Sequence, residues 1–128
     1  MYAFRTLIVE DNISFRVSLA RMLLARFPTM SIVTAAGTGP ALEMARRLAP
    51  DLVFMDVRLP DGNGLEATRA IKVQCVETVV VVVTAYDLPE YREAAYRCGA
   101  SYFFAKGVVS QEDIIGVVER TMNDVGAA

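Results

Sequence analysis

The chain alternates short apolar runs with segments whose apolar residues recur at helical spacing, and this alternation limits its fold more than any other feature. Short apolar runs that end at polar residues are typical of buried strands. The runs cover residues 6–9, 30–35, 52–55, 79–83 and 101–105, and the helical segments cover residues 13–27, 41–48, 65–73, 89–98 and about 110–123. Strands that alternate with helices favour a parallel sheet with helices on both faces. We therefore predict a three-layer α/β fold around a five-stranded parallel sheet.

Local residue chemistry marks the centre of this sheet and one of its loops. Val79 to Val83 is a run of five valines, and such a β-branched run suits a central parallel strand covered on both faces. The segment from Pro60 to Gly64 combines proline, aspartate, asparagine and glycine, which are typical of turns. We predict a central strand over the valines and a loop over residues 60–64.

Length and hydrophobic content exclude several protein classes. The chain has 128 residues, which fits one domain. Hydrophobic residues make up 54% of the chain and charged residues 22%, which excludes intrinsic disorder. The longest aliphatic run, Val79 to Val83, is far shorter than the ~20 apolar residues of a membrane span. We therefore expect a single globular domain that does not enter a membrane.

Scarce residue types exclude further functions. The formal net charge is −2 and no polybasic run occurs, which argues against binding of nucleic acid by this chain. Residues 1–5 lack the features of a secretory signal, and Cys75 and Cys98 do not make a disulfide framework, so we expect a cytoplasmic protein with reduced thiols. The absence of histidine excludes imidazole catalysis, histidine metal ligands and phosphohistidine on this chain.

Polar side chains follow four of the five predicted strands. Glu10 and Asp11 follow the first strand, Asp56 the third, Thr84 the fourth and Lys106 the fifth. Each residue alone is explained by a turn, a helix cap or a solvated surface. Ligands of parallel sheets bind beyond the carboxyl ends of the strands, where all five side chains would meet. Their occurrence together therefore predicts a site at that edge of the sheet.

The chemistry of these side chains is coherent. Three clustered carboxylates repel one another unless a cation joins them, and Mg²⁺ or Mn²⁺ suits oxygen ligands of this kind. A carboxylate beside such an ion can accept a phosphoryl group as a nucleophile. An ammonium and a hydroxyl can stabilise the charge of the transferring group. The residues thus suit phosphorylation of an aspartate by an external donor.

Four segments resemble the receiver domain of bacterial response regulators, in the CheY-like superfamily. They are Leu7–Asn12, Asp56–Glu66, Val83–Ala85 and Gly99–Lys106. The resemblance covers nearly the whole chain, with the motifs in the family's order. It implies a (βα)₅ flavodoxin-like sandwich. Residues 1–128 would then form a single receiver domain, with no output domain in this chain.

The resemblance also implies roles for the residues at the strand ends. Asp56 would be the phosphoacceptor and a ligand of Mg²⁺, and Asp11 would bind Mg²⁺ directly. Glu10 would bind the ion through water, and the backbone carbonyl of Arg58 would be a further ligand. Lys106 would pair first with Asp56 and then with the phosphoryl group.

Further roles concern switching and access. Thr84 would hydrogen-bond the phosphoryl group, and Phe103 would be either the switch aromatic that turns inward or a plain core aromatic. The Arg58 side chain could lie over the phosphoryl group and slow its hydrolysis, while the small Ala85 would leave the donor's approach open. Gly107 departs from the family, which usually has proline there, so we expect a trans bond and a freer loop after Lys106.

The resemblance implies a signalling switch of a two-component or phosphorelay system. Such a domain catalyses only its own Mg²⁺-dependent phosphotransfer and dephosphorylation. The donor would be a sensor histidine kinase or a histidine phosphotransfer protein. The target would be a downstream protein or an output domain, reached through the face formed by the helix over residues 89–98, the fifth strand and the last helix.

Three other functions are possible for such a fold. A flavodoxin-type flavin or nucleotide binder would need a phosphate-binding loop, and Gly37-Thr38-Gly39 is a weak match to one. A pseudo-receiver would use the same fold only to bind proteins, but the residues for phosphorylation are all present. A metal-dependent phosphatase or hydrolase with an aspartate nucleophile would need a second acid and a longer chain.

Overall fold

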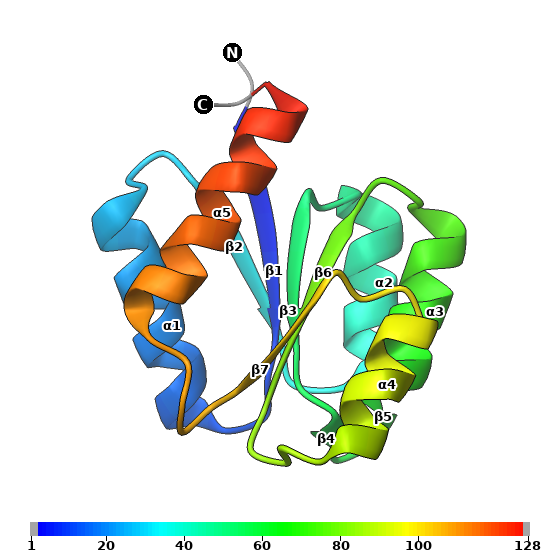
Figure 1. Ribbon diagram of the computed structural model, residues 1–128. Coiled ribbons are helices and arrows are strands. Elements are labelled where there is room, and N and C mark those ends of the chain that lie inside the picture. The colour runs from blue at the N-terminus through cyan, green and yellow to red at the C-terminus, as the bar shows by residue number, and fades with distance from the viewer. Residues whose placement is uncertain (1–2, 127–128) are drawn as a thin grey trace.

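A five-stranded parallel sheet forms the centre of the molecule (Figure 1). The structure, a computed structural model, describes residues 3–126. The strands lie in the order β2-β1-β3-β6-β7, so the chain winds outward from β1 in both directions. Their bounds are β1 Arg5–Val9, β2 Ser31–Ala35, β3 Leu52–Met55, β6 Val79–Thr84 and β7 Tyr102–Ala105. The predicted α/β class and five-stranded parallel sheet are confirmed, and the valine run lies in the strand between β3 and β7.

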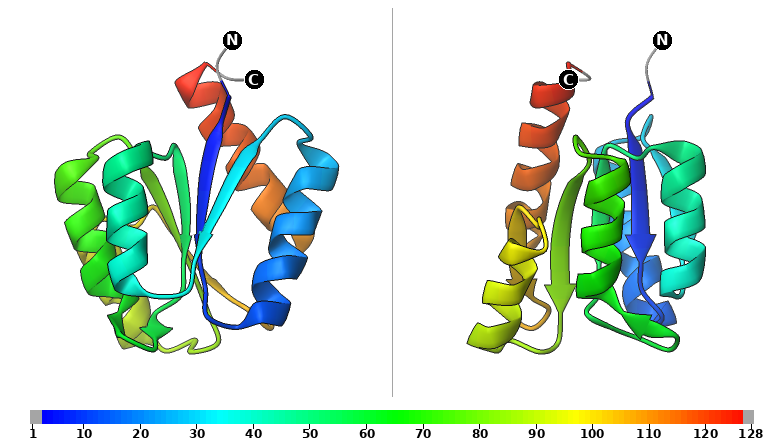
Figure 2. Two further views of the ribbon diagram at one scale, coloured as in Figure 1. Left: turned by 180° about the vertical axis from the view of Figure 1, so that it is seen from behind. Right: turned by 90° about the vertical axis from the view of Figure 1, so that its right-hand side faces the viewer.

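Helices cover both faces of this sheet. Their bounds are α1 Ile13–Arg26, α2 Thr38–Leu48, α3 Gly64–Gln74, α4 Pro89–Arg97 and α5 Gln111–Val125. Figures 1 and 2 show α1 and α5 on one face and α2, α3 and α4 on the other. None of the helices within residues 3–126 has the length and apolar character that crossing a bilayer requires.

The strands read as continuous apolar runs because successive side chains enter two different cores. In β3, Val53 and Met55 pack toward α2, α3 and α4, whereas Leu52 and Phe54 pack toward α1 and α5. All four side chains are buried. The sheet is therefore fixed from both sides, and its carboxyl edge is a rigid base for the residues that follow the strands.

The segment after β3 differs from the predicted loop over residues 60–64. Two short strands, β4 Arg58–Leu59 and β5 Gly62–Asn63, form an antiparallel hairpin, and α3 begins at Gly64. The turn residues Pro60 and Asp61 lie at the tip of this hairpin, so the turn chemistry was correct and the loop assignment too long. The strands β4 and β5 were not predicted because a strand of two residues is too short to show a periodic pattern.

Candidate functional site

Strand register brings the predicted polar residues to one edge of the sheet. Val9 of β1 lies opposite Met55 of β3, so Glu10 and Asp56 follow neighbouring strands at the same level. On the other side, Thr84 of β6 pairs with β7, and the Lys106 backbone N donates a hydrogen bond to the Thr84 carbonyl at 2.8 Å. The structure therefore places all five predicted residues at the carboxyl edge of the sheet.

Three carboxylates form the centre of the site. One oxygen each from Glu10, Asp11 and Asp56 lies within 4.8 Å of the other two. Glu10 and Asp56 are buried and Asp11 is exposed. The Val57 backbone N donates a hydrogen bond of 2.8 Å to Asp56 Oδ1. The Asn12 backbone N donates one of 3.1 Å to Glu10 Oε2. These bonds orient both buried carboxylates.

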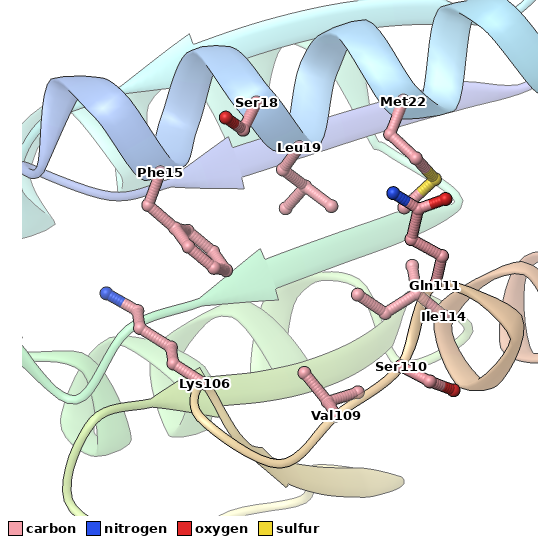
Figure 3. A pocket seen from close by; sticks show the side chains of 9 residues that line it. All are labelled: Phe15, Ser18, Leu19, Met22, Lys106, Val109, Ser110, Gln111 and Ile114. Atoms are coloured by element: carbon pink, nitrogen blue, oxygen red, sulfur yellow. The ribbon is translucent and has the colours of Figure 1, made fainter.

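Lys106 is the cation that faces these carboxylates. Its Nζ lies 2.7 Å from Glu10 Oε1 and 3.3 Å from Asp56 Oδ2. It also lies 4.5 Å from the centre of the Phe15 ring. Figure 3 shows its side chain extending toward Phe15 along the edge of a cavity of about 160 Å³ between α1 and the start of α5. The predicted pairing with Asp56 is present, but the contact with Glu10 is the shorter one.

Burial and neighbouring charges have opposite effects on the pKa values of Glu10 and Lys106. Burial raises the pKa of Glu10 above its usual range, although the hydrogen bond with Lys106 acts to lower it. Burial acts to lower the pKa of Lys106, but the bond to Glu10 and the charge of Asp56 outweigh this effect and raise it. Counted by formal charge, three carboxylates and the Lys106 ammonium leave an excess of two negative charges. That excess matches one divalent cation, and oxygen donors are its preferred ligands.

Thr84 and Phe103 are both directed inward. Thr84 is fully buried, and its Oγ1 accepts a hydrogen bond of 3.2 Å from the Tyr86 backbone N. Phe103 is buried in the core beneath α4, and the Arg92 guanidinium lies 4.8 Å from the centre of its ring. Phe103 thus has the packing of a core aromatic in an inward position, and a switching role stays a prediction.

The Arg58 side chain lies against two tyrosines. Its guanidinium is 4.2 Å from the centre of the Tyr86 ring, and its Nη2 donates a hydrogen bond of 3.2 Å to the Tyr91 hydroxyl. The hydrogen bond with Tyr91 and the electrostatic interaction with the two tyrosines raise the pKa of Arg58 further above its usual value, so the side chain keeps its positive charge. Ala85 is exposed beside Tyr86, and its effect on the donor's approach stays a prediction.

The hairpin after Asp56 is tied to α2 by Asp61. Helix α2 begins after Gly37, which has no side chain to cap it. Instead, Asp61 accepts hydrogen bonds from the backbone N of Thr38 at 2.7 Å and of Gly39 at 3.0 Å. A Cβ atom at position 37 would lie 2.7 Å from Asp61 Oδ1, so glycine leaves room for this contact. These hydrogen bonds hold in place the hairpin that carries the Arg58 carbonyl.

Four residues around the site escaped sequence analysis. Tyr86, Tyr91, Phe15 and Asp61 gain their roles from contacts with distant parts of the chain, and no local pattern identifies such contacts. The bond after Lys106 is trans as expected, because residues 3–126 contain no cis peptide bond.

Comparison with known proteins shows which chains share this arrangement. The pattern of the response regulator receiver domain matches residues 6–119. Response regulator GacA of Pseudomonas aeruginosa is 35% identical over 109 residues, which are 84% of this chain and 50% of that protein. Transcriptional regulatory protein PdtaR of Mycobacterium tuberculosis is 37% identical over 116 residues, which are 90% of this chain and 55% of that protein. The chain thus spans about half the length of these relatives.

A solved structure shares the whole fold. It is the crystal structure of a CheY-like response regulator receiver domain protein from Methanospirillum hungatei, with a TM-score of 0.87 and coverage of 96% of each chain. The two sequences are 23% identical, so this likeness supports the fold alone.

Proposed function

The chain belongs to the response regulator receiver domain family of two-component signalling, and on that premise we propose that Asp56 accepts a phosphoryl group with the help of Mg²⁺. The observation that carries this proposal is the meeting of Glu10, Asp11, Asp56 and Lys106 at one edge of the sheet. A flavin site or a protein-only interface would not require three carboxylates and an ammonium gathered at one edge of the sheet. The arrangement suits phosphoryl transfer to a carboxylate.

The phosphoryl group would move to Asp56 in a displacement at phosphorus. A carboxylate oxygen of Asp56 forms a bond to phosphorus while the P–N bond of an external phosphohistidine breaks. The donor imidazole keeps the electron pair of that bond and takes up a proton. The Lys106 ammonium, 3.3 Å from Asp56 Oδ2, compensates negative charge on the transferring oxygens. Hydrolysis by water later restores the carboxylate, so both reactions act on the domain itself.

A divalent cation, Mg²⁺ or Mn²⁺, fits the charge and the oxygen atoms of this cluster. We assign Asp11 and Asp56 as its direct carboxylate ligands and Glu10 as a ligand through water. The backbone carbonyl of Arg58 would complete the protein's share of the ligands. When bound, the cation would neutralise charge on the phosphoryl oxygens.

Thr84 and Phe103 would convert the added charge into a change of surface. The Thr84 hydroxyl would turn from the Tyr86 backbone N to a phosphoryl oxygen and donate a hydrogen bond to it. Phe103, which already lies in the core, would fill the space that the Thr84 hydroxyl leaves. The resulting shift between two populations would be read on the face formed by α4, β7 and α5.

The partners follow from the chemistry of the donor and from the family. The donor would be a sensor histidine kinase or a histidine phosphotransfer protein, and the small Ala85 would leave room for it beside Thr84. The target would be a downstream protein or an output domain. Residues 1–128 would act as one receiver domain in this exchange.

Intact-protein mass spectrometry after incubation with acetyl phosphate and Mg²⁺ tests the proposal. The wild type is expected to gain one phosphoryl group, and Asp56→Asn is expected to gain none. EDTA should prevent the gain in the wild type, and Asp124→Asn, an exposed charge-matched change in α5, should leave it intact. A wild type that gains no phosphoryl group from acetyl phosphate or from phosphohistidine donors would contradict the proposal and favour a pseudo-receiver.

A further inference from the structure

The Arg58 guanidinium makes its contacts on the side of the site toward α4. It covers the face of Tyr86 at 4.2 Å, and one of its nitrogens donates to the Tyr91 hydroxyl at 3.2 Å. The two tyrosine rings contact each other edge to face, with centres 6.3 Å apart. Three side chains from β4, from the loop after β6 and from the first turn of α4 therefore form one cluster, which we term the Arg58 clasp.

The clasp is linked to the proposed site in two ways, through the chain to Asp56 and through a hydrogen bond to Thr84. Arg58 is two residues after Asp56 and is exposed, so its guanidinium can move without disturbing a core. Tyr86 is joined to Thr84 because its backbone N donates to the Thr84 hydroxyl. A guanidinium carries five N–H donors, and it binds phosphate oxygens more strongly than it binds a neutral phenol.

We infer that Tyr91 is a positioning residue whose hydroxyl competes with the phosphoryl group of Asp56 for the Arg58 guanidinium. This inference rests on the proposed function. Before transfer, the clasp holds the guanidinium on the tyrosines. After transfer, a group with about two negative charges lies two residues away, and the guanidinium divides its time between that group and Tyr91. While the guanidinium covers the phosphoryl group, it hinders attack by water. Because Tyr91 holds the guanidinium away for part of the time, it shortens the lifetime of the acyl phosphate.

Phosphoryl lifetimes in a double-mutant cycle test this competition. Proteins are phosphorylated with acetyl phosphate and Mg²⁺, the small donor is removed, and loss of the phosphoryl group is followed by intact-protein mass. Tyr91→Phe removes only the hydroxyl and is expected to lengthen the lifetime about two- to five-fold, as suits an exposed contact. Arg58→Ala is expected to shorten it. In the Arg58→Ala background, Tyr91→Phe should have no effect, because Tyr91 acts through Arg58.

A matched control variant and an NMR measurement test whether an effect of Tyr91→Phe is specific to its contact with Arg58. Tyr96→Phe makes the same change on an exposed tyrosine of α4 and should leave the lifetime unchanged. In NMR spectra, the Arg58 side-chain protons should be shifted upfield by the Tyr86 ring, and this shift should become smaller when beryllofluoride and Mg²⁺ are added.

The results distinguish failure of the inference on Tyr91 from failure of the proposed function. Equal lifetimes for the wild type and Tyr91→Phe, or the same effect of Tyr91→Phe with and without Arg58, would overturn the inference while phosphorylation itself stands. An upfield shift that beryllofluoride does not change would overturn it as well. Absence of any mass gain in the wild type would overturn the inference together with the proposed function, and the upfield shift would then show that the clasp itself is present.

Discussion

Asp61 is a single residue whose charge links two elements of the fold. Both of its carboxylate oxygens accept hydrogen bonds from backbone N–H groups at the start of α2, and these bonds lower the pKa of Asp61 below its usual value of 3.8. An anion at this end of a helix also interacts favourably with the helix dipole. A group whose pKa is lower in the folded state adds stability above its unfolded pKa. That stability is lost as the pH falls through the folded value.

The Asp61→Asn variant is therefore expected to be less stable than the wild type near pH 7. The amide keeps one acceptor oxygen but loses the charge and the second acceptor. The difference between the two melting temperatures should be constant well above pH 3.8 and should begin to shrink as the pH approaches 3.8, where the unfolded chain takes up the proton. It should go on shrinking until the pH has fallen past the lower pKa of the folded carboxyl. Thermal unfolding followed by circular dichroism between pH 7 and pH 3 measures this. A difference that does not change below pH 3.8 would contradict the assigned role, and Asp124→Asn serves as the charge-matched control.

At the scale of elements, the junction between β3 and α3 determines where the phosphoacceptor lies. The hairpin of β4 and β5 folds back so closely that the Gly64 backbone N donates to the Val57 carbonyl at 2.7 Å. A Cβ atom at Gly64 would overlap the backbone carbonyl oxygen of Asp56. Glycine is required there by close approach of the backbone, because a carbonyl oxygen cannot move aside as a side chain can.

Two glycine-to-alanine variants should therefore have opposite effects. Gly64→Ala is expected to lower the free energy of unfolding by about 3 kcal/mol, since it forces the backbone of Asp56 to shift. Gly116→Ala, in the interior of α5 with no atom within 4 Å of the added Cβ, is expected to raise it by about 1 kcal/mol. Urea unfolding of both variants checks the pair. A Gly64→Ala variant as stable as the wild type would show that the junction is not as tight as described.

At the scale of the whole molecule, the site and the fold depend on each other. The three carboxylates come from residues 10, 11 and 56 and meet only when β1 and β3 are paired. A cation that needs all three therefore binds the folded chain and not the unfolded one, so its binding energy stabilises the entire domain. When no cation is bound, the three clustered carboxylates repel one another, which costs stability.

Mg²⁺ is accordingly expected to raise the free energy of unfolding of the wild type. The gain should reach about 2.7 kcal/mol at one hundred times the dissociation constant. Asp56→Asn should be more stable than the wild type in EDTA by roughly 1 kcal/mol, because one repelling charge is removed. It should gain much less from Mg²⁺. Urea unfolding with and without Mg²⁺ measures both effects. A wild type that does not respond to Mg²⁺ would contradict the metal site.

Local sequence patterns were sufficient to predict the main helices and strands and the residues at the carboxyl edge of the sheet. Strand and helix periodicity depends on residues close together in the chain, so all five strands of the sheet and all five helices were predicted within a few residues. Parallel strands place their carboxyl ends at one edge, and this rule alone predicted that Asp56, Thr84 and Lys106 would lie at that edge. The sequence by itself thus determined the class of fold and the residues at its carboxyl edge.

Only the tertiary structure decided which partner each of these side chains takes. Lys106 lies closer to Glu10 than to Asp56, Arg58 binds Tyr86 and Tyr91, and Asp61 caps a helix more than twenty residues away. The short hairpin after β3 likewise escaped prediction. These contacts join residues that are distant in the chain. Their distances depend on strand order, on close backbone packing and on the balance of burial against charge, which no local pattern carries.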